Sequence, residues 1–261
     1  MWRFGVVAAL AMALALAGCA GPDPSGVEIV VAGAVSLQDA LNAAATSYEH
    51  SHPAVGVRFS FDASSALRAQ IEQGAPVDAF ASADTTNPQQ LVDHGLADGP
   101  VKVIARNQLV IVVPRSVAAT VGTPLDLARS GVKVIAAGPA VPISKYAAQL
   151  IAGLARLPGY PPDYATRVAA NTVSREDNVR AIVAKVALGE GDAGIVYATD
   201  AMAANVGTIE IPAGSNVIAT YGAVTLSASR RPAQARAFLA WLAEPDGQAV
   251  LVRFGFLPAT P

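Results

Sequence analysis

Four turns of the sequence place hydroxyl groups or free backbone N–H groups where a predicted strand ends and a predicted helix begins. They are Ala34-Val35-Ser36-Leu37, Ala63-Ser64-Ser65-Ala66, Val141-Pro142-Ile143-Ser144 and Asp177-Asn178-Val179-Arg180. The first N–H groups of a helix have no partner within the helix, and the helix dipole adds partial positive charge there. Each turn can therefore hold an anion, and the four together predict one anion site made of neutral donors between two parts of the protein.

The serines in these turns also have a purely structural interpretation. Ser36, Ser64 and Ser65 stand where a serine commonly caps a helix, an interaction that stabilises the helix by roughly 1 kcal/mol. For any single serine, capping is the simpler interpretation. The recurrence of the same layout in four turns, together with Tyr197 at the end of another predicted strand, favours the anion site.

The sequence offers few groups for catalysis. It contains no Gly-x-Ser-x-Gly, His-Glu-x-x-His, P-loop or dinucleotide-binding motif. The three histidines, His50, His52 and His94, fall at predicted helix ends or in polar loops, and residues two apart do not share a helix face as a metal pair would. We therefore predict no enzyme, no catalytic residue, no cofactor and no resident metal. A hydrolase with a serine nucleophile is the alternative, and it needs a histidine within reach of that serine.

The elements that position the turns follow from hydrophobic periodicity. Predicted strands cover 28–32, 55–61, 77–81, 101–104, 109–113, 132–137, 169–173, 194–197, 209–211 and 217–226. Predicted helices cover 37–48, 65–73, 89–95, 123–127, 145–157, 161–168, 179–188, 199–204, 232–243 and 245–253. Strands alternate with helices twice over, which predicts an α/β protein with two lobes. The last strand and the closing helices are expected to return to the first lobe.

This pattern predicts a domain division with two crossings between the lobes. Lobe 1 is expected to comprise residues 27–104 and 222–261, and lobe 2 residues 105–221. The crossings are expected near 105–108 and 221–222.

Composition and the N-terminal sequence limit the class of the protein and its cellular location. The chain has 261 residues, 52% hydrophobic and 15% charged, and a formal net charge of −2, which argues against disorder and gives no basic surface for nucleic acid. Arg3 precedes an apolar run over 6–17, and Leu16-Ala17-Gly18-Cys19 resembles a bacterial lipobox. This predicts a signal peptide at 1–18, a lipidated Cys19 and a tether at 19–26; an uncleaved anchor with an incidental cysteine is the alternative. Cys19 is the single cysteine, so an intrachain disulfide is excluded.

Five separated motifs, in this order, resemble the periplasmic molybdate-binding proteins of bacterial ABC importers. They lie at 34–40, 64–78, 176–180, 194–197 and 254–256, and the resemblance extends over about 28–257. It implies a type II periplasmic-binding-protein fold, in which each of two lobes has a mixed sheet and a hinge joins them. We expect a monomer.

The resemblance also implies a set of oxyanion-binding residues. Ser36 and Ser64 would donate through hydroxyl and backbone N–H, Ile143 and Val179 through backbone N–H, and Tyr197 through its phenol. Ser65 replaces Ser64 if the register shifts by one residue.

Two positions depart from the family pattern. Ile143 stands where a small residue is common, and its larger side chain would reshape the pocket wall. Asp62 stands where a neutral residue is common. Because a carboxylate beside an oxyanion would repel it, we expect Asp62 to point away from the cleft.

The function that the resemblance implies is transport. The protein would bind molybdate or tungstate in the cleft, close by a hinge motion, and deliver the ion to the permease and ATPase of an importer. The lipid on Cys19 would hold it at the outer face of the cytoplasmic membrane. A receptor for another tetrahedral oxyanion, sulfate or phosphate, is the first alternative, and a serine hydrolase the second.

Overall fold

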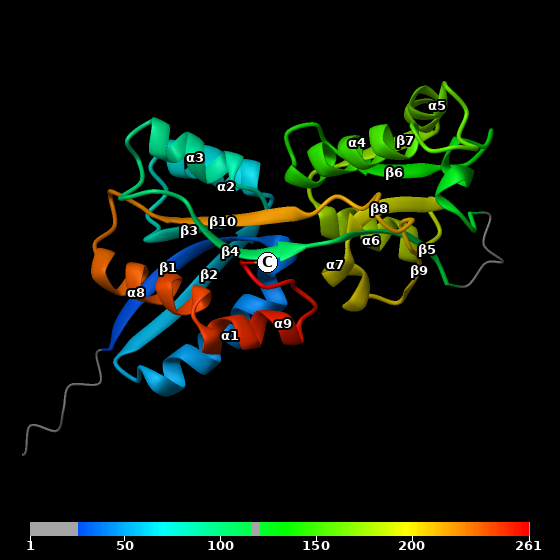
Figure 1. Ribbon diagram of the computed structural model, residues 1–261. Helices are drawn as coiled ribbons and strands as arrows, with labels where there is room; N and C mark the ends of the chain where they lie inside the picture. Colours follow the sequence, from blue (N-terminus) through cyan, green and yellow to red (C-terminus); the bar gives the residue numbers. More distant parts are fainter. Residues whose placement is uncertain (1–25, 116–120, 261) are drawn as a thin grey trace, which may run out of the picture.

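Two mixed β-sheets lie side by side in the computed structural model, which describes residues 26–115 and 121–260 (Figure 1). The first sheet has the strand order β2-β1-β3-β10-β4. Its strands are β1 (Val27–Ala34), β2 (Val55–Asp62), β3 (Ala79–Ser82), β4 (Lys102–Asn107) and β10 (Ala219–Thr225). β1 is parallel to β2 and β3, whereas β10 is antiparallel to β3 and β4.

The second sheet has the order β7-β6-β8-β5-β9. Its strands are β5 (Leu109–Pro114), β6 (Val134–Ala137), β7 (Thr172–Glu176), β8 (Ala193–Tyr197) and β9 (Val206–Ile209). β6 is parallel to β7 and β8, and β5 is antiparallel to β8 and β9. The predicted fold class, an α/β protein with a mixed sheet in each lobe, is therefore confirmed.

Helices cover both faces of each sheet (Figure 1). The first sheet has α2 and α3 on one face and α1, α8 and α9 on the other, while the second sheet has α4 and α5 on one face and α6 and α7 on the other. In lobe 1 the bounds are η1 (Val35–Leu37), α1 (Gln38–Ser51), α2 (Ser64–Glu72), α3 (Thr86–Asp93), α8 (Pro232–Ala243) and α9 (Pro245–Arg253). In lobe 2 they are η2 (Pro124–Ala128), α4 (Pro142–Leu154), α5 (Tyr164–Ala170), α6 (Val179–Ala187) and α7 (Ala198–Met202). Among the described helices, none combines the length and apolar character needed to cross a membrane.

The chain passes between the sheets at Gln108, and again over 210–218 between β9 and β10. Residues 105–107, expected in a crossing, are strand residues of β4, and 221–222 lie within β10. The polar residues Arg106 and Asn107 led the prediction to end β4 too early. In the fold Asn107 is fully buried, and Arg106 Nε donates to the carbonyl of Pro258 at 2.8 Å. The domain division remains a proposal: the first crossing, at Gln108, lies within the predicted 105–108, and the second, over 210–218, precedes the predicted 221–222.

Other element bounds also differ from the prediction. α4 begins at Pro142 rather than at residue 145, because a proline is well suited to the first turn of a helix. Residues 169–170, predicted as strand, end α5, and the following strand runs on through Glu176. β9 lies at Val206–Ile209, ahead of the predicted 209–211.

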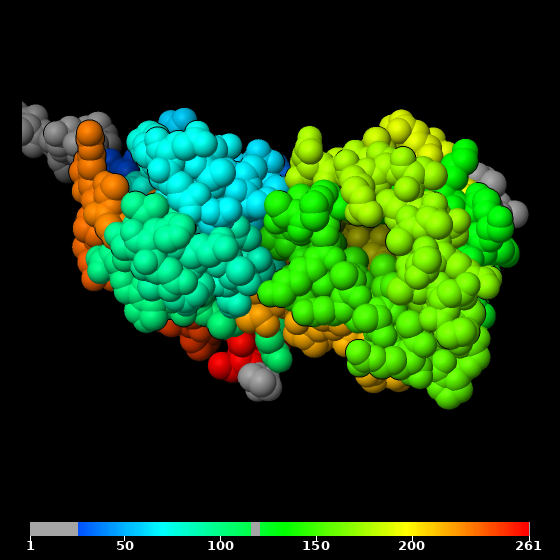
Figure 2. All heavy atoms as spheres, turned by 90° about the horizontal axis from the view of Figure 1, so that it is seen from above, coloured from blue at the N-terminus to red at the C-terminus, as the bar shows by residue number. Residues whose placement is uncertain are grey.

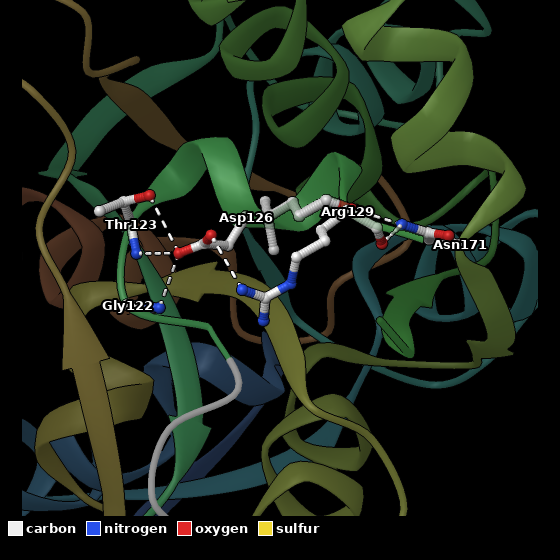
Figure 3. Close-up of polar contacts among 6 residues, drawn as sticks. Gly122, Thr123, Asp126, Arg129 and Asn171 are labelled. Carbon is white, nitrogen blue, oxygen red and sulfur yellow. Dashed lines mark hydrogen bonds and ion pairs between the residues drawn. The ribbon is translucent and has the colours of Figure 1, made fainter. Parts of the chain in front are cut away.

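A polar cluster in lobe 2 holds both ends of η2, and Asn171 joins its last turn to the end of α5 (Figure 3). Asp126 Oδ2 accepts hydrogen bonds from the N–H groups of Gly122 and Thr123 at 2.9 and 2.8 Å, and these bonds hold the pKa of the carboxyl below its ordinary value. Asn171 Nδ2 donates to the carbonyls of Leu127 and Arg129 at 2.8 and 2.7 Å. The loop before β6 is therefore held by side chains rather than by strand pairing.

Lobe 2 also has a hollow between α4 and the segment that contains α5 (Figure 2). The hollow is a largely apolar cavity of about 290 Å³. Alanines on both helices leave the space, because their side chains are too short to fill it; they are Ala147, Ala148, Ala152, Ala165 and Ala169. Ile143 borders this hollow and also the smaller cavity between the lobes.

Candidate functional site

A small cavity lies between the lobes, where the four turns meet. The residues that line it are Ala34, Val35, Ser36, Asp62, Ala63, Ser64, Ala83, Val141, Pro142, Ile143, Val179 and Tyr197. Only about 10 Å³ is open to the centre of a water-sized sphere, which is the room that about one water molecule needs. The space between these lobes fits one small solute rather than a sugar or a peptide.

All five predicted ligand residues border this cavity. They are buried, with exposed fractions of 7% for Ser36, 1% for Ser64, 1% for Ile143, 3% for Val179 and 1% for Tyr197. Of the two adjacent serines, Ser64 rather than Ser65 is among the described residues that line it.

Neither Ser36 nor Ser64 caps a helix, so the capping interpretation was wrong. Ser36 lies inside the short helix η1, and Ser64 follows the N-cap residue Ala63 of α2. Ser36 Oγ accepts a hydrogen bond from the Tyr221 hydroxyl at 3.2 Å, and Ser64 Oγ accepts one from the Ala83 N–H at 2.9 Å. A hydroxyl that accepts can still donate, and neither serine is seen to donate to another described residue, so each O–H can bind a ligand.

The Tyr197 hydroxyl is a buried donor with no hydrogen-bond partner among the described residues. Tyr197 ends β8 and borders the cavity. Burial raises the pKa of its phenol well above the ordinary value, and nearby Tyr221, Tyr146, Asp200 and Asp84 add to the effect. The phenol therefore stays protonated, and its O–H has no acceptor among the described residues.

The backbone donors come from the first turns of α2, α4 and α6. Ser64 and Val179 are the first residues of their helices and Ile143 the second, so their N–H groups have no acceptor within the helix. Asn178 caps α6 by accepting from the Ala181 N–H at 3.1 Å. That bond leaves the Val179 N–H for the cavity.

Two positioning residues were missed by the sequence analysis. Tyr221, predicted only as a strand and crossing residue, donates to Ser36 and lies 185 residues away from it in sequence. Asn107 Nδ2 donates to Thr199 Oγ1 at 2.9 Å and to the Tyr221 oxygen at 3.4 Å. This chain of bonds from lobe 2 to lobe 1 sets the direction of the Ser36 hydroxyl. Only the three-dimensional fold brings these residues together.

Asp62 is among the residues that line the cavity, and the expected direction of its carboxylate, away from the cleft, stays a prediction. Its Oδ1 accepts a hydrogen bond from the Ala63 N–H at 2.7 Å. The parallel pairing of β1 with β2 places Asp62 beside Ala34, at the strand end where both turns begin. The carboxylate thus uses one backbone donor that an anion would otherwise share.

The remaining charges lie outside this cavity. Among the described residues, no lysine or arginine lines it, and no group of three or more His, Cys, Asp or Glu is placed to hold a metal ion. An anion bound here would therefore be held by neutral donors.

The geometry does not support a serine hydrolase. The described residues include all three histidines, and none of these is hydrogen-bonded to Ser36 or Ser64. His52 stacks on Tyr48 at a centroid distance of 4.1 Å, and His94 lies 3.3 Å from Glu72. Within the described ranges, no histidine is therefore placed as a general base for either serine.

A second, larger space of about 360 Å³ adjoins the anion cavity and shares Ser36 with it. Asp39, Arg180, Asp200 and Arg253 contribute its charged groups. Asp200 is 6% exposed, and its Oδ2 has no partner among the described residues. Burial raises the pKa of Asp200 to about 7, an effect that Arg180 opposes and Asp39 reinforces.

Comparison with known proteins identifies the family. Residues 29–257 match the family described as bacterial extracellular solute-binding protein. The chain belongs to this family. It is 33% identical over 239 residues to the molybdate-binding protein ModA of Mycobacterium tuberculosis H37Rv, an alignment that covers 91% of this chain and 87% of that protein. The predicted resemblance to the molybdate-binding proteins is thereby confirmed.

Solved structures agree on the fold of this family member. The periplasmic molybdate-binding protein of Azotobacter vinelandii superposes with a TM-score of 0.73 at 24% identity, covering 88% of this chain and 98% of that one. The sulfate-binding protein SubI of Mycobacterium tuberculosis superposes with a TM-score of 0.80 at 19% identity, covering 90% and 88%. Because receptors named for two different oxyanions fit similarly well, fold similarity alone does not select the ligand.

Tyr197→Phe and Tyr164→Phe should have opposite consequences for the unliganded protein. The Tyr197 hydroxyl has no partner within the described part of the chain, so its removal should leave the free energy of unfolding unchanged or raise it. The Tyr164 side chain is equally buried, but its hydroxyl donates to the Pro124 carbonyl at 2.6 Å. Losing that bond should cost about 1–3 kcal/mol. Urea unfolding measures both, and a loss above about 1 kcal/mol for Tyr197→Phe would show that its hydroxyl has a structural partner.

Asp200→Asn should remove a pH dependence of stability. The folded protein keeps the Asp200 proton up to about pH 7, whereas the unfolded chain releases it near the ordinary pKa of about 3.9. The wild type should therefore lose stability relative to the variant as pH rises from about 4 to about 7, and no further above that.

Urea unfolding between pH 5 and 8 measures this difference. Asp126→Asn is the control, because the lowered pKa of Asp126 confines its effect to pH values below about 4. A wild-type-minus-Asp200→Asn difference that is the same at pH 5 and pH 8 would contradict the assignment.

Proposed function

We propose that this protein is an extracytoplasmic receptor that binds molybdate, and also tungstate, in the interlobe cavity and delivers it to an ABC importer. The observation that carries the proposal is the buried, protonated Tyr197 hydroxyl, which has no hydrogen-bond partner among the described residues and lies at a cavity that two serine hydroxyls also border. The 33% identity to a molybdate-binding protein supports the choice of ligand.

Neutral donors suit a receptor that must also release its ligand. A dianion gains strong charge-assisted hydrogen bonds from N–H and O–H groups. A buried lysine or arginine would add a desolvation cost and a charge that must separate again at release. With no cation among the described lining residues, selection depends on the size of the cavity and the placement of its donors.

The proposed ligands are Ser36, Ser64, Ile143, Val179 and Tyr197, and they come from both lobes. Ser36 and Ser64 belong to lobe 1, and the other three belong to lobe 2. An anion that bridges the two groups stabilises the closed arrangement, and opening about Gln108 and 210–218 would release it.

The proposed cellular setting rests on the N-terminal sequence. We propose that 1–18 is a signal peptide and that a lipid on Cys19, followed by the tether 19–26, holds the protein at the outer face of the cytoplasmic membrane. The signal peptide and Cys19 lie outside the described residues. The proposed partners are the permease and ATPase of the importer, with the receptor itself a monomer, not an enzyme and without nucleic acid.

Molybdate should stabilise the protein against thermal unfolding. At about 100 times its Kd a ligand adds roughly 2.7 kcal/mol, which for a protein of this size raises the midpoint by roughly 5–10 °C. Tungstate should act similarly, and sulfate and phosphate should have smaller effects because they are smaller tetrahedra.

Calorimetric titration with Tyr197→Phe should give about 10- to 100-fold weaker molybdate binding, while Tyr164→Phe should bind like the wild type.

Two outcomes would overturn the proposal in different ways. A larger rise of the unfolding midpoint with sulfate or phosphate would support a receptor for that other oxyanion. The similar fold of the sulfate-binding protein SubI is consistent with this alternative. An unchanged midpoint in millimolar molybdate would show that molybdate is not the ligand.

A further inference from the structure

One ion pair joins the two lobes beside the anion cavity. Arg180 Nη2 of α6 in lobe 2 lies 2.6 Å from Asp39 Oδ2 of α1 in lobe 1. A second contact, from Lys145 Nζ to Thr86 Oγ1 at 3.2 Å, joins α4 to α3. Both contacts connect elements on opposite sides of the cleft, so both are lost when the lobes separate.

Each partner of the ion pair is close in sequence to a proposed ligand residue. Arg180 directly follows Val179, and Asp39 stands three residues after Ser36. The pair therefore fixes the distance between one donor turn of lobe 1 and one of lobe 2.

The position of Arg180 is unfavourable for its own helix. It is the second residue of α6, where the partial positive charge of the helix dipole repels a cation. Asp39, the second residue of α1, is in the favourable position for an anion. The helix alone thus gives no reason for an arginine there, whereas a carboxylate on the other lobe does.

The charges around Arg180 favour the closed arrangement. The space that adjoins the pair is lined by Asp39 and Arg253 from lobe 1 and by Arg180 and Asp200 from lobe 2. Each lobe thus presents one acid and one base to the other. Closure brings Arg180 to the carboxylate of Asp39, and within its own lobe Arg180 also lowers the pKa of Asp200 against the effect of burial, which raises it.

We propose that Arg180 and Asp39 are positioning residues that hold the lobes closed over the bound anion and slow its release. This inference rests on the proposed function. The side chains remain 35% and 47% exposed, so water competes for the pair and its contribution is modest. A modest contribution suits a receptor that must open again.

The alternative is that these charges act only through their field on the anion. Asp39 would then repel the ligand, so Asp39→Asn would tighten binding. An interlobe ion pair predicts the opposite sign, because removing its carboxylate favours opening. The direction of the Asp39→Asn effect therefore separates the two explanations.

The experiment measures molybdate association and dissociation by stopped-flow tryptophan or tyrosine fluorescence, with calorimetric Kd values alongside. Asp39→Asn and Arg180→Gln should each weaken binding about two- to fivefold, mainly through faster dissociation. The double variant should be little weaker than either single one. Arg180→Lys should keep part of the wild-type affinity, and high salt should shrink the difference between Asp39→Asn and wild type.

Matched controls are ion pairs that lie within one lobe. Glu28 pairs with Arg58 at 3.5 Å in lobe 1, and Asp163 with Arg167 at 2.8 Å in lobe 2. Glu28→Gln and Asp163→Asn should leave molybdate dissociation unchanged.

The outcomes are distinguishable. Tighter or unchanged binding by Asp39→Asn, in a wild type that binds molybdate, would overturn the interlobe role alone. A wild type that does not bind molybdate would overturn the proposed function, and the inference with it.

Discussion

A hydrogen-bond donor buried without an acceptor costs a folded protein about 1–3 kcal/mol, and the interlobe cavity gathers several of them. The Tyr197 hydroxyl has no partner among the described residues, and Ser36 and Ser64 each keep a free O–H. The first N–H groups of three helices at the cavity also have no acceptor within their own helices. A small oxyanion would supply acceptors to all of these groups at once.

The fold concentrates these donors because strand ends and helix starts coincide at the cleft. In lobe 1, β1 leads into η1 and β2 into α2; in lobe 2, β6 and β7 lead into α4 and α6. Bonds from elsewhere then orient the side chains: Tyr221 from β10 holds Ser36, and Ala83 after β3 holds Ser64. Both serine hydroxyls thus depend on strands that join the first sheet, and Tyr221 is in turn bonded to Asn107.

Much of this architecture could be predicted from the sequence, because it depends on local periodicity. The turns at Ser64 and Val179, the stop at Gly74 with its positive φ of 89°, and the closing helices at 232–243 and 245–253 follow from neighbouring residues. What failed depends on contacts between distant segments. β4 continues through Arg106 and Asn107 because other parts of the fold satisfy their side chains. From the sequence alone the serines resemble helix caps. In the fold their oxygens instead accept hydrogen bonds from Tyr221 and Ala83, which are distant in sequence.

The most direct test of the account is a crystal structure with molybdate, with the metal located by anomalous scattering at the molybdenum absorption edge. The account predicts one molybdenum peak in the cavity between the lobes. Its oxygens should lie within hydrogen-bond distance of the Ser36 and Ser64 hydroxyls, the Ile143 and Val179 N–H groups and the Tyr197 phenol. A peak outside this cavity, or an anion held there by a lysine or arginine side chain, would contradict it.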